Sequence, residues 1–321
     1  MVDQAAGAKT TEWRVPAESA SLRLDAFVRR ALPHLSRRAI DQAIGEQLFQ
    51  INGRAGKKGD RLAAGDCVAF AGPVEWLDER PPPARFDVPI IYEDDAMLAL
   101  DKPAGVATHG FSARDGVTVA NFIAARWPEL ANVGKSRWEP GLVHRLDVET
   151  SGLILVAKTQ AAFDSLRTQF RRREVRKTYW ALVWGDTDDH GIIDFPLAHD
   201  RSDKRKMRAL KPGRSDKPAR TWRALTQYRK IGAANGMSLL EIIMTTGVTH
   251  QIRVHLAALG HVIVGDRLYG AQHEAAFGLQ RHFLHAKGLA FTHPSDDRAL
   301  KLDTELAPEL GEVLRRLGIK H

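Results

Sequence analysis

The segment from Gly141 to Thr159 constrains the fold more than any other part of the chain. It sets a charged cluster, His-Arg-Leu-Asp at 144–147, shortly before the apolar run 153–157. That run is short, rich in β-branched residues and bounded by polar residues, which predicts an interior strand of a sheet. Asp147 is therefore expected at the rim of the sheet. An ordinary aspartate in such a place pairs with a neighbour such as Arg145 or caps the turn that follows.

Length, composition and charge narrow the class of protein. A chain of 321 residues exceeds one average domain, which predicts one large and one small domain, and its 44% of hydrophobic residues can form a sizeable core. The formal net charge of +8 favours a polyanionic partner, because lysine and arginine side chains near phosphates release condensed counterions. A membrane surface would tolerate the same charge, but nucleic acid is the favoured partner.

The number of cysteines and the N-terminal residues indicate the cellular compartment in which the protein is expected. The single cysteine, Cys67, excludes an internal disulfide framework, and its apolar surroundings predict a buried thiol in a strand. Residues 1–9 lack the basic leader and apolar run of a signal peptide, and no later stretch is long enough to span a bilayer. We therefore expect a cytoplasmic protein without a membrane partner.

The chain is expected to divide at the rigid run Pro81-Pro82-Pro83, which is typical of a linker. The expected parts are a flexible tail at 1–17, a small α+β domain at 18–76, a proline-rich linker at 77–88 and a large domain at 89–321.

Two helices are predicted in the small domain. Apolar residues at helical spacing over 24–32 predict the first, and Ser36 is a suitable N-cap for the second. Arg37 and Arg38 then occupy the first turn of the second helix, where positive charge opposes the helix dipole. Helix stability therefore does not explain these arginines.

A hairpin follows the two helices. Asn52-Gly53 is a strong turn signal, and basic residues including Lys57 come before a closing strand. This order, with the sequences LSRRAIDQAI and INGR, resembles the S4 RNA-binding domain. The resemblance implies that Arg37, Arg38 and Lys57 contact RNA. An ordinary solvated basic face is the alternative.

The charged cluster carries a second resemblance. HRLD followed by TSG closely resembles the catalytic motif of the RluA family of pseudouridine synthases, and DKPAGVATHG at 101–110 resembles the motif that precedes it in that family. The resemblance implies that Asp147 is the catalytic carboxylate. It also implies that Arg145 replaces the flipped target base in the RNA stack, with His144 among the substrate-binding residues.

The family's second motif corresponds to Lys-x-Tyr at 177–179. The stretch 175–183 alternates as a strand, which puts Tyr179 and Trp180 on opposite faces. Either aromatic ring could be ordinary core. The resemblance selects Tyr179 as the tyrosine that stacks on the target base.

The third motif, THQIRVH, begins at Thr249. Thr249 can cap a helix that carries positions 252, 256 and 259 inward and stops at Gly260. The resemblance implies that Arg253 pairs with Asp147, which would keep the carboxylate ionised and oriented. Thr249 and His250 join the expected substrate-binding residues.

A closing motif at 283–286 resembles the one whose apolar side chain packs on the flipped base, which implies this role for Leu284. Attack by the carboxylate at C1′, attack at C6 and elimination through a glycal all remain open. The isomerisation is redox-neutral, so no cofactor is expected.

A metal site is not expected either. His250, His255 and His261 do not share one helical face, and His273-Glu274 lacks a second histidine at the spacing of a zinc protease.

Basic segments are expected to guide the RNA backbone. Arg171-Arg172-Arg173 ends a helix predicted from the apolar positions 163, 166 and 170, and the stretch 201–220 is a basic loop or irregular hairpin. Complementing the helix dipole or simple solvation would be the ordinary explanations.

These features predict an α+β protein with a mixed, mainly antiparallel central sheet flanked by helices and loops, the pseudouridine synthase fold, and a small N-terminal S4-like domain. The expected function is RNA pseudouridine synthase, most suited to large-subunit ribosomal RNA, with no obligate protein partner. Transfer RNA is an alternative substrate, and a noncatalytic ribosome assembly factor is an alternative function. Val148 and Val248 stand where the family commonly has basic residues, so the RNA contacts at these two positions are expected to differ from those of the family.

Overall fold

The structure is a computed structural model that divides into two compact units, Met1–Ala84 with His109–Pro128 and Arg85–Thr108 with Glu129–His321. It describes residues 11–33, 35–73, 77, 81–110, 115–213, 218–270 and 277–320. Several predictions lie outside these ranges: part of the tail and of the linker, Arg214 and Lys217 of the basic stretch, and His273-Glu274. The backbone of Arg38 is described but its side chain is not.

The first unit combines a small sheet with helices. Its four strands pair in the order β1-β4-β2-β3. The elements are β1 (Glu12–Arg14), a short 3-10 turn (Ala17–Ser19), α1 (Leu24–Ala31), α2 (Arg37–Gly45), β2 (Phe49–Ile51), β3 (Arg54–Ala55), β4 (Cys67–Phe70) and α3 (Val119–Arg126).

Local chemistry accounts for these elements. The hydroxyl of Ser36 accepts a hydrogen bond of 3.1 Å from the backbone N–H of Ala39, which confirms the predicted cap of α2. Asn52 and Gly53 have φ values of 50° and 80°, so the predicted hairpin joins β2 and β3. The thiol of Cys67 is half-buried rather than buried, because strand alternation turns its neighbours toward the core instead.

The second unit is built on a large sheet whose strands run β5-β6-β7-β14-β8-β13-β12-β9, with β15 paired to β14. Its strands are β5 (Ile90–Glu93), β6 (Met97–Lys102), β7 (Ser151–Ala157), β8 (Arg176–Trp184), β9 (His190–Ile193), β12 (Thr226–Ala234), β13 (Met237–Met244), β14 (Leu284–Thr292) and β15 (Ala299–Asp303). Its helices are α4 (Gln160–Arg172), α5 (Gln251–Leu259) and α6 (Pro308–Leu317), and a 3-10 turn spans Pro128–Asn132.

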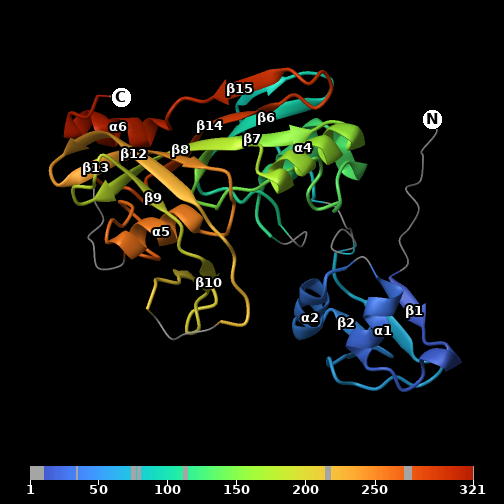
Figure 1. Cartoon of the computed structure of the whole chain (residues 1–321). Helices are drawn as coiled ribbons and strands as arrows, with labels where there is room; N and C mark the ends of the chain where they lie inside the picture. Colours follow the sequence, from blue (N-terminus) through green and yellow to red (C-terminus); the bar gives the residue numbers. More distant parts are fainter. Residues whose placement is uncertain are drawn as a thin grey trace. The chain divides into compact units, whose positions relative to one another are not determined.

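The pairing is mixed and mainly antiparallel, as predicted. In this sheet, β7 and β14 pair in parallel and the other pairs of described strands are antiparallel. Figure 1 shows α4 beside β7 and α6 at the end of the sheet formed by β12 and β13. Apolar side chains join these layers: Phe163 and Leu166 of α4 pack with Leu153 and Leu155 of β7.

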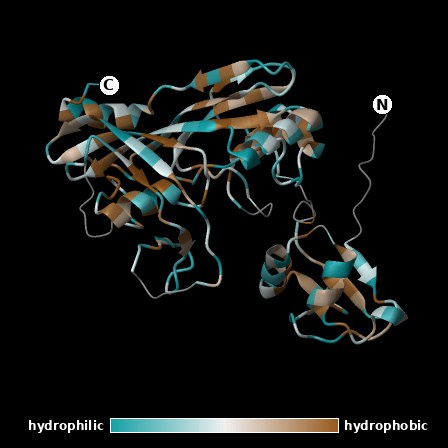
Figure 2. Cartoon of the chain, in the orientation of Figure 1, coloured by the Kyte–Doolittle hydropathy of each residue, from teal (hydrophilic) through white to brown (hydrophobic). Residues whose placement is uncertain are grey.

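The predicted interior strand is confirmed, because every residue of β7 is buried. Figure 2 shows hydrophobic stretches along the strands of the large sheet. At the start of β7, Gly152 pairs with Ala286 of β14 and has a φ of 114°. A Cβ at this position would lie 2.3 Å from the carbonyl oxygen of Ala286, so glycine allows the two strands to approach.

The backbone before β7 is held on both sides of Asp147. Thr108 exchanges hydrogen bonds with Leu146, accepting from its N–H at 3.1 Å and donating to its carbonyl at 2.9 Å. The carbonyl of Val148 accepts from the buried ammonium of Lys102 at 2.9 Å and from the N–H of Gly105 at 2.9 Å. These contacts fix the chain direction at the carboxylate.

The basic stretch forms a short hairpin in its described part. Strands β10 (Leu197–His199) and β11 (Met207–Ala209) pair antiparallel around the loop 200–206, and together they are called the basic hairpin below. Lys204 and Arg205 at its tip are exposed. The prediction of an irregular hairpin is therefore confirmed for these residues.

Among the described residues, no helix has the length and apolar character needed to cross a membrane.

The substitution Gly152→Ala tests the close approach of β7 and β14. It should lower the free energy of unfolding by about 3 kcal/mol, because backbone strain adds to a clash with Ala286. Gly236→Ala is the matched control: its φ is also positive, at 71°, but nothing lies within 4 Å of the added Cβ. Urea unfolding of both variants measures the difference, and equal losses would contradict a packing role for Gly152.

Candidate active site

A cavity of about 430 Å³ opens next to Asp147. Its walls come from the segment before β7, from α4, β8, β14 and the turn that leads from β13 into α5. Its volume falls within the range of about 300–1,000 Å³ typical of pockets for small ligands. The lining residues are Val143, His144, Arg145, Leu146, Asp147, Thr150, Arg167, Phe170, Arg171, Arg173, Lys177, Tyr179, Arg223, Met244, Thr245, Thr246, Gly247, Val248, Thr249, His250, Gln251, Ile252, Arg253 and Leu284.

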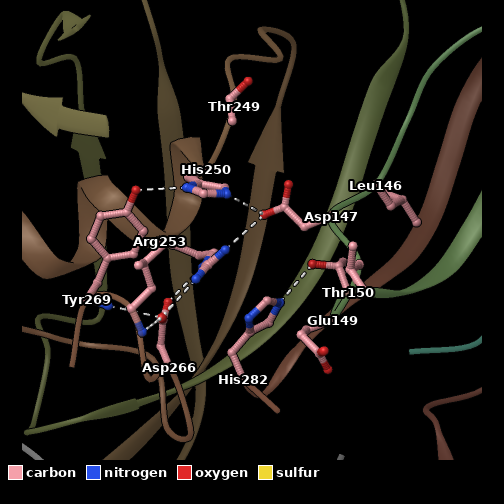
Figure 3. Close-up of polar contacts among 12 residues, drawn as sticks. Leu146, Asp147, Glu149, Thr150, Thr249, His250, Arg253, Asp266, Tyr269 and His282 are labelled. Carbon is pink, nitrogen blue, oxygen red and sulfur yellow. Dashed lines mark hydrogen bonds and ion pairs between the residues drawn. The ribbon is translucent and has the colours of Figure 1, made fainter. Parts of the chain in front are cut away.

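The carboxylate of Asp147 is held through one of its two oxygens. Nη1 of Arg253 donates a hydrogen bond of 3.2 Å to Oδ2, and Nε2 of His250 lies 3.8 Å from the same oxygen. Figure 3 shows both side chains converging on the carboxylate. The pairing of Arg253 with Asp147 expected from the sequence is present. Within the described ranges, Oδ1 accepts no hydrogen bond from another residue, and the side chain is 27% exposed.

Arg253 is itself held by a second carboxylate. Its Nε and Nη2 donate to the two oxygens of Asp266 at 2.7 and 2.9 Å, in the bidentate geometry that suits guanidinium and carboxylate. Asp266 is 1% exposed and also accepts from the backbone N–H groups of Leu268 and Tyr269. Burial would raise the pKa of Asp266, but Arg253 outweighs it and holds that pKa below 3.8.

The turn before α5 differs from the prediction. Thr249 does not cap the helix; His250 is the N-cap residue, in the left-handed conformation with a φ of 57°. The hydroxyl of Thr249 instead accepts a hydrogen bond of 3.2 Å from Nη2 of Arg145. Positive φ is uncommon for a residue with a side chain, and such strain often occurs where a side chain must be aimed. Here it directs His250 toward the carboxylate.

The rest of α5 follows the prediction with one exception. Arg253 lies in its first turn, Ile252 and Leu256 are buried, and Gly260 ends the helix with a φ of 93°. Leu259 was expected to face inward, but it is 40% exposed because the last turn of the helix extends beyond the core.

Two apolar surfaces close the cavity. Tyr179 of β8 and Leu284 of β14 are both buried and both line it. The prediction of strand alternation is confirmed, since Tyr179 is buried while Trp180 is half-buried. Burial and the negative charge of Asp147 raise the pKa of Tyr179, so its hydroxyl keeps its proton at neutral pH.

His144 is another lining residue of the cavity. Its Nε2 accepts a hydrogen bond of 3.0 Å from the backbone N–H of Leu155, and its ring stacks on Phe170 with the ring centres 4.8 Å apart. Burial lowers the pKa of His144 to about 3, so the imidazole is neutral. The contacts anchor this ring to β7 and to α4.

Positive charge surrounds the cavity. Among the described residues that line it, Asp147 is the only acidic side chain. The exposed lining arginines are Arg145, Arg167, Arg171, Arg173 and Arg223. Arg172, predicted to act with its neighbours, does not line the cavity. The exposed Arg37 and Lys57 belong to the first unit and are not among the lining residues.

The other histidines considered for a metal have ordinary partners. His255 is buried between the hydroxyl of Thr226 and the carbonyl of Phe195, and His261 lies 3.0 Å from the carbonyl of Trp184. In the parts of the chain that the structure describes, no group of three or more His, Cys, Asp or Glu residues is arranged to hold a metal ion.

Asp266 and Tyr269 were not predicted as site residues from the sequence. Both belong to the segment VIVGDRLYG, in which an apolar run ends at glycine and aspartate. The same pattern of an acid beside a buried run had singled out Asp147, so it could have marked Asp266 as well. Thr150 and His282, whose side chains lie 2.9 Å apart below the carboxylate, were also missed (Figure 3).

Known proteins resemble this chain over most of its length. The model of the RNA pseudouridylate synthase family matches residues 96–258. An uncharacterized RNA pseudouridine synthase of Mycobacterium bovis is 38% identical over 94% of this chain and 96% of its own length. The ribosomal large subunit pseudouridine synthase D of Nitrosomonas europaea is 32% identical over 96% of this chain and 88% of its own length.

Solved structures that resemble this chain belong to the same kind of protein as the sequence relatives. The human RNA pseudouridylate synthase domain containing 4 protein has a TM-score of 0.56 and 25% identity, covering 72% of this chain and 94% of its own. The human RNA pseudouridylate synthase domain containing 1 protein has a TM-score of 0.55 and 25% identity, covering 72% of this chain and 95% of its own.

Asp266→Asn tests the second carboxylate of the site. Removing one partner of a buried ion pair should lower the free energy of unfolding by about 3 kcal/mol at neutral pH. Because the folded pKa of Asp266 is below 3.8, its contribution should persist above that pH and be lost as the pH falls through the folded pKa. Urea unfolding at several pH values measures it. Asp186→Asn, whose carboxylate is 79% exposed, is the control and should cost little; a similar small loss in both would contradict the role of Asp266.

Proposed function

The chain belongs to the RNA pseudouridylate synthase family, and on that premise we propose that it converts specific uridines of large-subunit ribosomal RNA into pseudouridine, with Asp147 as the catalytic carboxylate. The observation that carries the role of Asp147 is its place as the one acidic side chain among the described lining residues, paired with Arg253. The names of relatives in Nitrosomonas europaea and Neisseria meningitidis support ribosomal RNA as the substrate class.

The reaction defines what the cavity must do. The bond between N1 and C1′ breaks, the uracil turns, a bond between C5 and C1′ forms, C5 loses a proton and N1 gains one. The detached base has to remain in place while it turns. Tyr179 and Leu284 provide apolar walls for this purpose, and the target nucleotide has to leave its stack to enter the cavity.

The two oxygens of Asp147 have different roles in this proposal. Oδ2 accepts the hydrogen bond from Nη1 of Arg253, which fixes the rotation of the carboxylate. Oδ1 then faces the substrate and acts at the glycosidic bond. A carboxylate that is oriented before the substrate arrives needs no rearrangement during the reaction.

The exposed arginines around the cavity bind the RNA backbone in this proposal. Positive side chains at the mouth attract phosphates without reading bases, and Arg145 is suited to fill the space of the flipped base because its guanidinium is exposed and held by Thr249. Val248 also lines the cavity and contributes no positive charge at that point.

The first unit adds a second RNA contact. We assign residues 18–76 to an S4-like RNA-binding domain and 89–321 to the catalytic domain. The exposed Arg37 and Lys57 support RNA binding by the first unit. The single cysteine is consistent with a reducing compartment, and we propose the cytoplasm.

Release of tritium from C5 of uridine tests both the reaction and its substrate. Wild-type protein should release tritium from unmodified large-subunit ribosomal RNA and not from transfer RNA. Asp147→Asn should abolish release while its affinity for RNA stays near that of wild type, because the amide keeps the shape but not the charge.

Asp164→Asn is the matched control, since Asp164 is exposed on α4 outside the cavity and should leave release unchanged. Release from transfer RNA alone would replace the proposed substrate. Tight RNA binding without release from either RNA would instead favour a noncatalytic assembly factor, and full activity of Asp147→Asn would overturn the role of Asp147.

A further inference from the structure

The hydroxyl of Tyr269 lies between the basic hairpin and the carboxylate. It accepts a hydrogen bond of 2.9 Å from the backbone N–H of Met207 in β11, and it lies 2.8 Å from Nδ1 of His250. The guanidinium of Arg253 lies over the ring of Tyr269, with Cζ 5.1 Å from the ring centre. Figure 3 shows Tyr269 behind His250, on the side away from Asp147.

These contacts determine where the protons lie. Burial raises the pKa of Tyr269 to about 12, so the hydroxyl keeps its one proton. The N–H of Met207 can only donate, and therefore occupies one lone pair of the oxygen. Among the described residues, the remaining partner of the hydroxyl is Nδ1 of His250. Of these two partners, Nδ1 is the one that can accept the hydroxyl proton.

A neutral imidazole carries one proton, and one that accepts at Nδ1 carries it at Nε2. Burial lowers the pKa of His250, which favours the neutral ring at pH 7. Nε2 is the atom that lies 3.8 Å from Oδ2 of Asp147. In the opposite tautomer a lone pair would face the negative oxygen and the hydroxyl proton would lose its acceptor.

We propose that Tyr269 is a positioning residue that fixes His250 in the tautomer with its proton at Nε2, so that two donors face Oδ2 of Asp147 and Oδ1 is left for the substrate. The catalytic part of this inference rests on the proposed role of Asp147. Tyr269 acts through His250 and does not line the cavity itself.

The same hydroxyl connects the carboxylate to the basic hairpin. Met207 belongs to β11, and its buried side chain packs in an apolar cluster with Leu197 and Val254, beside Tyr269. The exposed Lys204 lies in the loop of the same hairpin. An RNA that binds this hairpin would therefore also fix the position of the backbone N–H of Met207, which orients the hydroxyl of Tyr269.

The variant Tyr269→Phe removes the hydroxyl and keeps the ring over Arg253. Nuclear magnetic resonance of the full chain labelled with ¹⁵N-histidine reports the tautomer of each imidazole, and His250→Ala identifies the signals of His250. Wild type should show the proton at Nε2. Tyr269→Phe should shift His250 toward the Nδ1 tautomer; the same tautomer in both proteins would overturn the proposal.

Turnover gives the second readout. Tyr269→Phe should lower kcat about tenfold, a loss typical of removing a group that orients a catalytic residue, with KM for RNA unchanged. Tyr228→Phe is the matched control: this tyrosine is buried in β12 outside the cavity, so its hydroxyl can be removed without a change in kcat. An equal loss in both variants would indicate a merely structural effect and contradict the proposal.

A double variant separates action through His250 from other effects. In a His250→Ala background, Tyr269→Phe should cause little further loss of kcat, because the residue through which it acts is gone. Losses that multiply would contradict the proposal. If wild type itself releases no tritium, the proposed function fails, but the tautomer comparison still decides whether Tyr269 sets the state of His250.

Discussion

The site depends on one cation shared by two carboxylates. Arg253 is fixed by the bidentate pair with the almost fully buried Asp266, and its remaining Nη1 reaches the more exposed Asp147. A guanidinium held at one end in this way has little freedom at the other. Asp147 is thereby oriented while it stays accessible. The positive charge of Arg253 also compensates the buried negative charge of Asp266.

The sheet places the other partner of this contact. The buried strand β7, and its close approach to β14 at Gly152, fix where the chain enters the sheet. Thr108 and Lys102 hold the backbone on either side of Asp147. Arg253 and Asp147 are 106 positions apart in sequence, so neither local segment creates the pair by itself. Helix α5 and the segment that leads into strand β7 present Arg253 and Asp147 to the same cavity.

Local features were predictable from the residues themselves, whereas the long-range pair of Arg253 and Asp147 was expected only from the family resemblance. The apolar run of β7, the cap at Ser36 and the glycine stop of α5 follow from nearby residues, and the structure has all three. The prediction that Thr249 caps α5 was wrong, because the left-handed turn at His250 depends on packing around the cavity rather than on propensity. A local pattern could mark Asp266 as a candidate, but the contacts of Asp266 and Tyr269 depend on how a later loop folds back against α5.

The most direct test is a structure of the full chain bound to large-subunit ribosomal RNA in which 5-fluorouridine replaces the target uridine. Fluorine at C5 prevents the loss of a proton that completes the reaction, so the modified nucleotide should remain in the cavity. Oδ1 of Asp147 should lie at the ribose or uracil ring, with Oδ2 still bound to Arg253. A base held elsewhere, or an Asp147 that turns away from it, would contradict the catalytic role of Asp147.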